Sequence, residues 1–367
     1  MTKFPFPGLP WIPQELIIRQ MKPGDVISFG QTSTRIKRMV QGCHLRIRES
    51  VWTFTKKFIA IDLFFPRENP NPFTIKLQNC TEPEWKDMVL EHLRNMEPIG
   101  WQAAMILDNL QVPVHNHRMI IYQCHGITYI SRQTDDRWDF YIRDLELQVG
   151  GFGLVSQSLW DLFRVEKVSV TSMGSERWLY TRNLLQSVTY FEKFHFVVDT
   201  VERQLTNTEI QFLLSNVNAE KFEMNCRFDT KFSYSEPLHQ RNFVVDYGHW
   251  LQLHNFLEMS CQHFSCEEHN FSSKELNELL IEWVSSNSLG SLETFHIRKS
   301  WVINRDQLFD GIEVTSWNQD LRPRFYKDID CSTGEDIRSI DGRLATVKIE
   351  TKSFFFVAWN PEPYSPE

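Results

Sequence analysis

Two stretches, LTNTEIQFLLSNV (205–217) and FSSKELNELLIEWV (271–284), carry the same helix signal and decide the fold. In both, a hydroxyl residue is followed three positions later by glutamate, the capping-box pattern that closes the N-terminus of a helix. The two pairs are Thr206 with Glu209 and Ser272 with Glu275. Apolar residues then recur at spacings of three and four, which predicts one buried face on each helix. The two stretches therefore predict two copies of one structural unit.

Each predicted helix leads into a strand-like run, at 220–228 and at 292–300. Two further helix-then-strand units occupy 175–198 and 249–266. The strand centres lie 28, 22, 20 and 31 residues apart, at Phe194, Phe222, Val244, Phe264 and Phe295. Such a period is typical of a leucine-rich-repeat-like stack, in which each unit buries its apolar face against its neighbours. An ordinary α/β domain with coincidental spacing is the alternative.

The C-terminal stretch 336–359 predicts two strands joined around Asp341-Gly342, a dipeptide that favours a hairpin turn. We expect this hairpin to close the last edge of the stack. Residues 44–80 and 118–148 alternate between apolar and polar residues and are rich in β-branched and aromatic ones, which predicts strands. One helix is predicted between them, over 81–96, with Thr81 and Glu84 as its capping box.

The N-terminal residues 4–40 predict three short helices. In LPWIPQELIIRQM (9–21), Leu16, Ile17 and Met21 form a one-turn apolar repeat. We expect Asp25 to cap the second helix and Ser33 to cap the third. Three helices in so few residues bury too little apolar area to stand alone. They need a partner chain or the rest of the protein.

The net charge of −8 is unevenly spread along the chain. The first 60 residues hold ten Lys and Arg against three Asp and Glu, a balance of +7, which leaves −15 for the remainder. The basic excess centres on 34–48. A nucleic-acid-binding arm is one interpretation, but no base-reading motif accompanies the charges. We favour cations that complement the dipole of a helix C-terminus, and so expect no nucleic-acid partner.

The seven cysteines are odd in number, scattered and without a CxxC motif. That usage predicts free thiols in a reducing compartment. No stretch approaches the roughly 20 apolar residues of a membrane-spanning helix, and no N-terminal segment is typical of a signal peptide. We therefore expect an intracellular protein, cytoplasmic or nuclear or both, that does not bind a membrane.

No motif for catalysis or cofactor binding is present: there is no P-loop, no GxSxG and no HExxH. The densest metal-like cluster is CQHFSCEEH (261–269), but its two cysteines are separated by four residues and no second pair of cysteines follows, as a structural zinc site usually requires. The stretch VHNH (114–117) is interpreted as a polar loop. We expect no catalytic, cofactor-binding or metal-binding residues, and no enzyme.

Residues at both ends of the chain carry a resemblance to a known family. At the N-terminus these are Phe6-Pro7, Leu9-Pro10, Ile17, Ile18, Met21, Pro23, Asp25, Val26, Ile27, Ser33 and Lys37-Arg38. Near the C-terminus the pattern R-x-x-D-G-x-x-A-x-V-x-I, followed by F-x-F-x-x-W, runs from Arg338 to Trp359, and PEWKDM adds to it upstream. Together they resemble a nematode-type F-box protein with a C-terminal type 2 F-box-associated domain.

The resemblance implies an α+β or α/β chain in three parts. These are an F-box at 4–43, a β-rich connecting region with one helix at 44–159, and a repeat-like substrate-binding domain at 160–360. It implies a substrate-recognition subunit of a Skp–cullin–F-box ubiquitin ligase, with a Skp-type adaptor, through it a cullin, and a protein substrate as partners. The implied adaptor contacts are Leu9, Pro10, Leu16, Ile17, Met21, Val26 and Ile27.

Three positions depart from the family pattern. Gln20 stands where a hydrophobic residue is frequent, Lys22 where an acidic one is common, and Gly24 in place of a bulky residue. The alternative function is therefore a repeat-type protein-interaction module with a degenerate F-box and no ligase role.

Overall fold

The structure is a computed structural model that divides into two compact units, unit 1 (Met1–Ser187) and unit 2 (Val188–Glu367). Within them it describes residues 10–30, 33–55, 58–66, 72–79, 84, 118–124, 127–133, 137–142, 156, 159–173, 181–182, 184–185, 188–198, 205–227, 232–257, 260–285, 289–298, 302–351 and 353–359. Each unit is of mixed α/β class and is dominated by a mixed sheet. None of the helices in these ranges is long and apolar enough to cross a bilayer.

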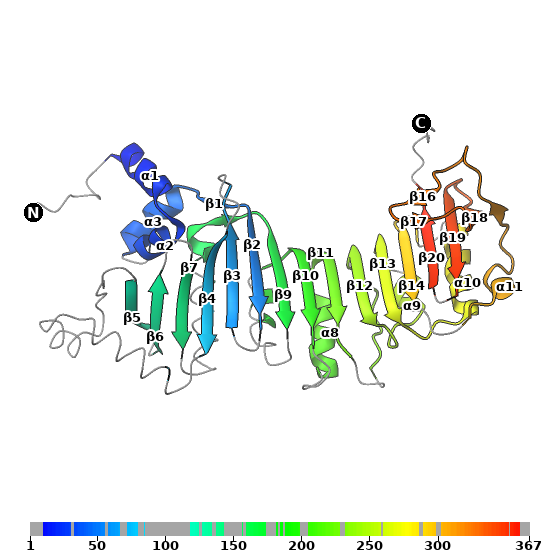
Figure 1. The fold of residues 1–367 in the computed structure, drawn as a ribbon, viewed down its shortest axis with the longest axis horizontal. Coiled ribbons are helices and arrows are strands. Elements are labelled where there is room, and N and C mark those ends of the chain that lie inside the picture. The colour runs from blue at the N-terminus through cyan, green and yellow to red at the C-terminus, as the bar shows by residue number, and fades with distance from the viewer. Residues whose placement is uncertain are drawn as a thin grey trace, which may run out of the picture. The chain divides into compact units, whose positions relative to one another are not determined.

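Unit 1 begins with three short helices, α1 (Trp11–Gln20), α2 (Pro23–Gly30) and α3 (Thr34–Gly42), drawn in blue in Figure 1. The Ser33 side chain accepts a hydrogen bond from the Ile36 backbone amide, so the predicted cap of α3 is confirmed. The predicted cap of α2 is wrong. Helix α2 starts at Pro23, which suits a first helical position, and this places Asp25 inside the first turn.

The basic stretch 34–48 does not complement a helix C-terminus, because the last turn of α3 contains no basic residue. Two of its cations, Lys37 and Arg46, instead form ion pairs within unit 1. The Lys37 Nζ lies 2.5 Å from Asp161 Oδ2, and the Arg46 guanidinium lies 3.6 Å from a Glu166 carboxylate oxygen. These pairs join the first sixty residues to residues more than a hundred positions later.

The strands of unit 1 confirm the predicted β-rich region. They are β2 (Glu49–Phe54), β3 (Phe58–Phe64), β4 (Phe73–Asn79), β5 (Arg118–Cys124), β6 (Ile127–Gln133), β7 (Arg137–Ile142) and β9 (Val168–Met173). Their order is β9-β2-β3-β4-β7-β6-β5, with β2–β9 and β4–β7 parallel and the other pairs antiparallel. Two short strands, β1 (Arg46–Ile47) and β8 (Arg164–Val165), pair separately. The helix predicted over 81–96 lies outside the described residues except for Glu84, which is helical.

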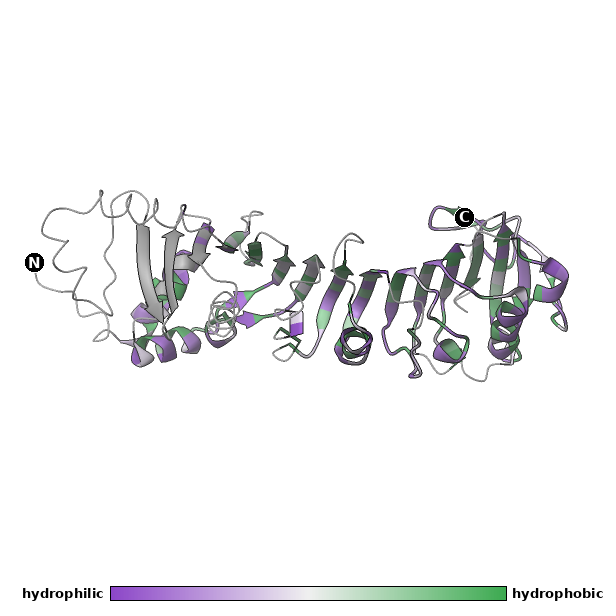
Figure 2. Ribbon diagram, turned by 90° about the horizontal axis from the view of Figure 1, so that it is seen from below, coloured by the Kyte–Doolittle hydropathy of each residue, from purple (hydrophilic) through white to green (hydrophobic). Residues whose placement is uncertain are grey.

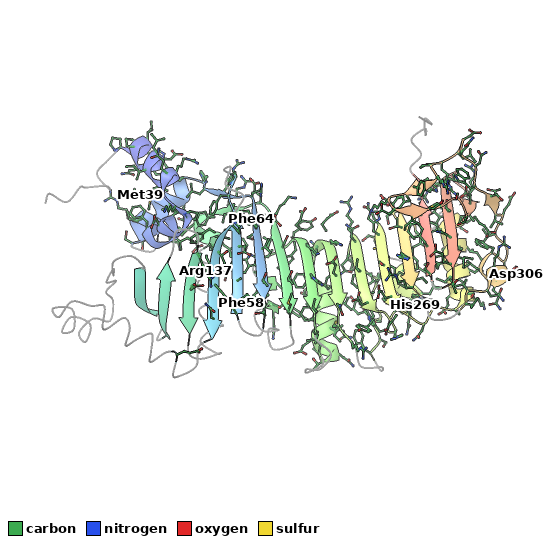
Figure 3. The ribbon with its side chains drawn as sticks, viewed as in Figure 1. Met39, Phe58, Phe64, Arg137, His269 and Asp306 are labelled. Carbon is green, nitrogen blue, oxygen red and sulfur yellow. The ribbon has the colours of Figure 1, made fainter. Side chains whose placement is uncertain are left out.

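Every second side chain along β2 is buried, so one face of this strand contributes to the core of unit 1. Trp52 in this strand is fully buried and stacks on Trp160, with ring centroids 5.7 Å apart. In β3, whose ends are marked by Phe58 and Phe64 in Figure 3, the intervening apolar residues are buried. A Cβ at Gly30 of α2 would come within 2.7 Å of Leu162, so this helix packs closely on the rest of unit 1.

Unit 2 is built on five parallel strands that neighbour one another in chain order. They are β10 (Phe191–Val197), β11 (Ala219–Asn225), β12 (Asn242–Tyr247), β13 (His263–Glu268) and β14 (Thr294–Arg298). All five predicted strands are confirmed, although Phe243 rather than Val244 aligns with the other central phenylalanines. Helices α8 (Asn207–Asn216), α9 (His254–Leu257) and α10 (Ser273–Val284) connect successive strands and lie on one face of the sheet (Figures 1 and 2).

Both capping boxes predicted in unit 2 are present. The Thr206 hydroxyl accepts from the Glu209 amide and the Glu209 carboxylate accepts from the Thr206 amide, and Ser272 and Glu275 do the same at α10. The aligned apolar residues of α8 and α10 face the sheet and are buried: Ile210, Leu213 and Leu214 in α8, and Leu276, Leu279, Leu280 and Trp283 in α10. The repeated sequence pattern thus produces a repeated local structure.

A row of phenylalanines forms the core between the sheet and its helices. The parallel register places Phe194, Phe222, Phe243, Phe264 and Phe295 side by side, with successive ring centroids 5.6, 5.4, 6.1 and 4.9 Å apart. Phe256 of α9 contacts two of these rings, which shows that the row faces the helices. Hydrophobic and hydrophilic residues alternate along these strands in Figure 2, so the opposite face is polar.

The C-terminal strands close the sheet at β14, as predicted, but with three strands where two were expected. The three are β18 (Glu335–Arg338), β19 (Leu344–Glu350) and β20 (Ser353–Ala358). The turn at Asp341-Gly342 joins β18 to β19, and Gly342 adopts φ 88°, which favours glycine. Strand β20 folds back between β19 and β14 and pairs antiparallel with both. Two-residue β15 (Thr315–Ser316) pairs with β18 and ends the sheet.

The boundary between the units falls at Ser187, not at the predicted domain start of 160. Strand β9 explains the difference, because it pairs with β2 and therefore belongs to unit 1. Of the helix-then-strand unit predicted over 175–198, short helical pieces at 181–182 and 184–185 lie in unit 1 and β10 begins unit 2.

Candidate functional site

Helix α1 presents apolar side chains to solvent. Ile12 and Leu16 are 68% and 54% exposed, while Gln14 and Ile18 on the opposite side of the helix are buried. Trp11 and Ile17 flank the exposed pair at 43% and 40%. Contiguous exposed apolar side chains of this kind mark interaction surfaces in soluble proteins. We call Trp11, Ile12, Leu16 and Ile17 the α1 patch.

Two contacts hold α1 against α3. The Arg19 guanidinium donates to the carbonyl of Cys43, the C-cap of α3, at 2.6 Å. Within α1 it also donates to the Glu15 carboxylate at 2.8 Å. The Trp11 ring lies so close to Gly42 that a Cβ there would come within 2.8 Å of it. The helix is thus fixed by its buried side and by the Arg19 and Trp11 contacts near its ends. Trp11 is still 43% exposed, and Ile12, Leu16 and Ile17 of the α1 patch are exposed beside it.

The seven residues predicted to contact an adaptor separate into exposed and buried groups. Leu16 and Ile17 belong to the α1 patch, and Pro10, also exposed, is the N-cap of α1. Met21 is half-buried at the C-cap, and Leu9 lies outside the described residues. Val26 and Ile27 are buried within unit 1, because α2 packs against α3 and, at Gly30, against Leu162. Their side chains serve the core of unit 1 and offer no surface.

Unit 2 has a second candidate surface on the face of its sheet away from α8, α9 and α10. We call it the open face. Alternation along β10–β14 places there Lys193, His195, Lys221, Glu223, Val244, Asp246, His263, Ser265, Glu267, Thr294, His296 and Arg298. Because the strands are in register, side chains from residues 21 to 31 positions apart become neighbours.

The cations of the open-face strands all have carboxylate partners among the described residues. Glu223 lies 2.7 Å from Lys193 Nζ and 2.5 Å from Lys221 Nζ. Burial would raise the pKa of the Glu223 carboxyl, but the two lysine hydrogen bonds outweigh it and hold that pKa below its ordinary value. Arg298 pairs with Glu267 at 2.7 Å. The positive charges of this face are therefore largely neutralised.

Asp246, by contrast, has no hydrogen bond or ion pair with any residue in the described part of the chain. Burial and the nearby Glu267 raise the pKa of its carboxyl; His195 opposes the rise, and Glu223 and Glu268 add to it. The carboxylate thus lies in a region of negative potential, where a cation would be stabilised.

Three histidines, His195, His263 and His296, lie on the open face, and we call them the open-face histidines. Burial lowers the pKa of all three imidazoles. Neighbouring glutamates oppose the shift but do not cancel it, so the rings are neutral at pH 7. The open face consequently gains positive charge on acidification.

A pocket of about 1040 Å³ lies at the β14 end of the open face. Its floor comes from β14, β20 and β19, including His296 and Phe355, whose rings meet edge to face at 5.7 Å. Its wall is the hairpin of β16 (Phe325–Tyr326) and β17 (Ile329–Asp330), which contributes Asp328 and Ile329. The pocket therefore combines aromatic and aliphatic surface with charged groups, as binding pockets for side chains do.

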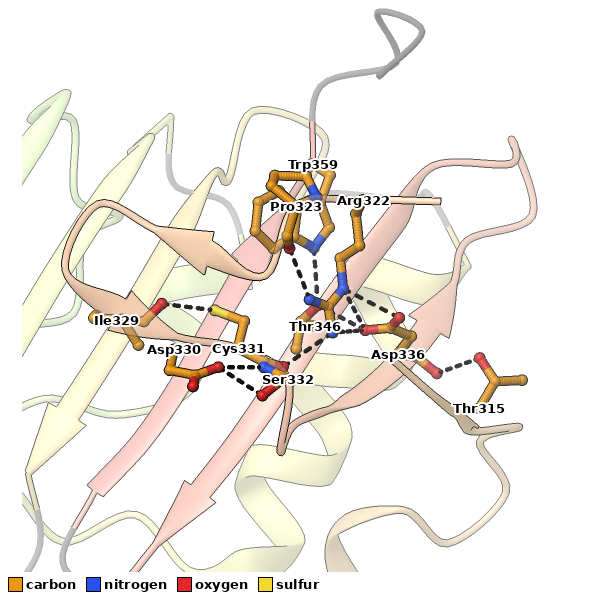
Figure 4. A network of polar contacts seen from close by, with 10 residues as sticks. All are labelled: Thr315, Arg322, Pro323, Ile329, Asp330, Cys331, Ser332, Asp336, Thr346 and Trp359. Atoms are coloured by element: carbon orange, nitrogen blue, oxygen red, sulfur yellow. Dashed lines mark hydrogen bonds and ion pairs between the residues drawn. The ribbon is translucent and has the colours of Figure 1, made fainter. Parts of the chain in front are cut away.

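A buried ion pair fixes the loop that carries this hairpin (Figure 4). Arg322 and Asp336 are both almost fully buried, and the guanidinium donates to the carboxylate through Nε and Nη2 at 2.9 and 2.7 Å. Arg322 also donates to the Cys331 carbonyl at 3.0 Å and lies over the Trp359 ring. Tyr326 and Ile329 pack on a small core that includes Phe355. The pocket wall is thus anchored at its base and along its side.

The residues of the cluster at 261–269 separate in the structure. Cys261 and Cys266 are both buried, and burial raises the pKa of the Cys261 thiol to about 12 and that of Cys266 further. His263 is on the open face, and its Nδ1 lies 2.9 Å from the Thr294 hydroxyl. No group of three metal-ligating side chains occurs in the ranges that the structure describes. The stretch 114–117 lies outside those ranges.

Sequence reasoning missed the open-face ion pairs, the pocket and the buried Arg322–Asp336 pair. The polar alternation of β10–β14 is visible in the sequence and could have located the open face. The pocket could not have been located in this way. Its wall is a hairpin of two strands, each only two residues long, that pair with each other and with no strand of the large sheet.

Two proteins of Caenorhabditis elegans are similar to this chain. Uncharacterized protein F59B2.8 is 23% identical over 379 aligned residues, which cover 98% of this chain and 78% of that protein. Uncharacterized protein F59B2.9 is 24% identical over 123 residues, covering 30% of this chain and 28% of that protein. No family model matches the chain, and no solved structure matches it.

Proposed function

We propose that this chain is a substrate receptor of a Skp–cullin–F-box ubiquitin ligase. In this proposal helices α1–α3 are the F-box and dock the Skp-type adaptor, and through it a cullin. Unit 2 binds the protein substrate. The chain carries no catalytic residue of its own, and it acts by bringing a substrate close to the enzymes of the complex.

The α1 patch is the observation that carries the proposal. A short helix whose exposed side is apolar while its other side is already packed is suited to insertion into a groove of a partner. The resemblance of residues 6–38 to an F-box names the partner as a Skp-type adaptor. The buried Val26 and Ile27 would then support α2 from within, leaving Leu16 and Ile17 as direct contacts.

The substrate-binding assignment rests on the open face. In-register parallel strands with helices on one side are the arrangement of leucine-rich-repeat-like stacks, whose free strand face commonly binds partners. The C-terminal strands would then be the cap that ends the stack.

Co-purification with the adaptor tests the proposal. The side chains of Ile12 and Leu16 are 68% and 54% exposed, so burying each of them on binding should contribute about 1 kcal/mol to the binding free energy. The variant Ile12→Ala/Leu16→Ala should therefore bind the adaptor about thirtyfold more weakly than wild type. Ile340→Ala, which truncates a 79% exposed isoleucine in unit 2, is the matched control and should bind normally. Absence of adaptor binding by wild type at micromolar concentration would refute the proposal.

A second candidate function is an interaction module without a ligase role, and Gln20 favours it. Gln20 is exposed and follows Ile12 and Leu16 at four-residue intervals, so it extends the α1 patch with a polar side chain. In this case unit 2 binds its partners while wild type captures no cullin, and Gln20→Leu raises adaptor affinity from a low level. Tight adaptor binding by wild type would exclude it.

A further inference from the structure

The open face distributes its charges asymmetrically, and this asymmetry indicates what it binds. Its strand cations are all engaged by carboxylates: Lys193 and Lys221 by Glu223, Arg298 by Glu267, and Lys348 by Glu350 at 2.6 Å. An acidic partner would have to displace an existing ion pair at each of these positions.

Two carboxylates of this surface have no such partner in the described part of the chain. One is Asp246, near the centre of the open face. The other is Asp328, in the turn of the β16–β17 hairpin, which lines the pocket. The only described cation in that turn, Lys327, lies over the Tyr326 ring at 5.4 Å. Both carboxylates can therefore accept a cation from another molecule without breaking an existing pair.

The net charge of unit 2 favours the same partner. Residues 188–367 contain 17 Lys and Arg against 28 Asp and Glu, a net charge of −11. A negative potential of this size attracts a basic chain and speeds its association.

The lining of the pocket indicates which side chain of a partner would fit it. Phe355 and His296 form an aromatic floor, and Ile329 and Ile349 add aliphatic surface. An arginine side chain suits this combination, because its planar guanidinium stacks on aromatic rings while it pairs with a carboxylate at the rim. A lysine would form the ion pair but would stack less well.

We propose that the open face of unit 2 binds a basic peptide segment of a partner protein, with one arginine entering the pocket to pair with Asp328 and a second basic residue pairing with Asp246. The inference rests on the proposed substrate-binding role of unit 2. Asp246 lies in β12, and the pocket floor begins at β14, two strands away, so the peptide crosses about 10 Å, or about three extended residues, between Asp246 and the edge of the pocket.

Fluorescence anisotropy with the full chain tests this proposal. The probe is a fluorescein-labelled dodecapeptide with Arg at every fourth position and Ala, Ser or Leu between, and a matched peptide carries Glu in place of Arg. We expect the Arg peptide to bind and the Glu peptide not to. A Lys peptide should bind more weakly than the Arg peptide.

Three charge-neutralising variants locate the binding. Asp246→Asn and Asp328→Asn should each lower the affinity for the Arg peptide about three- to tenfold, as expected for loss of one charged contact at a partly exposed site. Asp306→Asn removes the same charge from α11 (Arg305–Leu308), which packs on α10 away from the open face (Figure 3), and should bind like wild type.

Equal binding of the Arg and Glu peptides, no binding of the Arg peptide at 100 μM, or an equal loss in all three variants would overturn the proposal. None of these outcomes affects the adaptor test, because Asp246→Asn and Asp328→Asn leave residues 11–42 unchanged. Failure of the basic-peptide proposal and failure of the ligase-receptor proposal are therefore distinguishable.

Discussion

Removal of one partner from the buried Arg322–Asp336 pair should destabilise unit 2 strongly. The Asp336 carboxylate accepts from the Arg322 guanidinium and, at 2.7 Å, from the Thr346 hydroxyl. Thr346 in turn accepts from the Trp359 indole at 2.8 Å. In the Arg322→Met variant, the Asp336 carboxylate loses the guanidinium and keeps only the hydrogen bond from the Thr346 hydroxyl. It is then a buried charge without a counter-ion.

The expected cost of Arg322→Met is about 3–5 kcal/mol, because a buried ion loses its counter-ion in a site that excludes water. The double variant Arg322→Met/Asp336→Leu removes both charges and leaves apolar side chains in their place. Its cost should be clearly smaller than that of Arg322→Met alone, since no buried charge is left unpaired. This inversion, with the double variant more stable than the single one, is the specific signature of a buried pair.

Urea unfolding measures the stability change, and amide hydrogen exchange with mass spectrometry locates it. We expect faster exchange in peptides from β18, β19 and the β16–β17 hairpin, with exchange in unit 1 unchanged. Arg324→Met, which breaks an exposed pair with Asp330 in the same loop, is the control and should have a far smaller effect. A loss for Arg322→Met no larger than for Arg324→Met, or a double variant that loses more than the single one, would refute the reasoning.

Two further predictions concern the same sheet. The open-face histidines bind protons more weakly in the native state than in the unfolded chain, so their contribution to stability is full above their ordinary pKa of 6.5 and is lost as the pH falls below it. Thermal unfolding at pH 7.5 and 5.5 should show this loss, and His296→Gln should reduce the difference; an unchanged difference would contradict the assignment. Gly248→Ala should cost about 1–3 kcal/mol, because the added Cβ meets Cys266 Sγ and a Leu251 methyl, whereas Gly290→Ala has open space and should be neutral by urea unfolding. Equal effects of the two glycine substitutions would show that the contact at Gly248 is easily relieved.

Local signals predicted the regular parts of unit 2 well. The capping boxes at Thr206 and Ser272 lie within four residues, and a cap depends mainly on its own turn. The spacing of the central phenylalanines predicted the strands, because each unit repeats the same helix and strand. The turn at Asp341-Gly342 was equally local.

The errors arose where contacts join distant residues. Strand β9 pairs with β2 over a separation of more than a hundred residues, and this pairing moved the unit boundary away from 160. The cations of 34–48 find carboxylates at Asp161 and Glu166, which no helix-dipole argument could identify. Val26 and Ile27 were predicted to face a partner, although an apolar residue on a short helix gives no sign of whether its own chain or another covers it.

The same geometry explains why the core of unit 2 could be predicted and its binding specificity could not. In parallel strands held in register, the row of positions that packs against the helices must be apolar. The alternate row, on the opposite face of the sheet, is free to vary. The first row carries the phenylalanines, and the second carries Asp246 with the ion pairs around it. In the proposed function, a partner contacts only the second row and the pocket beside it. Under the two proposals, we expect substitutions in the second row to change which peptide is bound without disturbing the core. We expect substitutions on the α1 patch to change adaptor docking without disturbing the core or the open face.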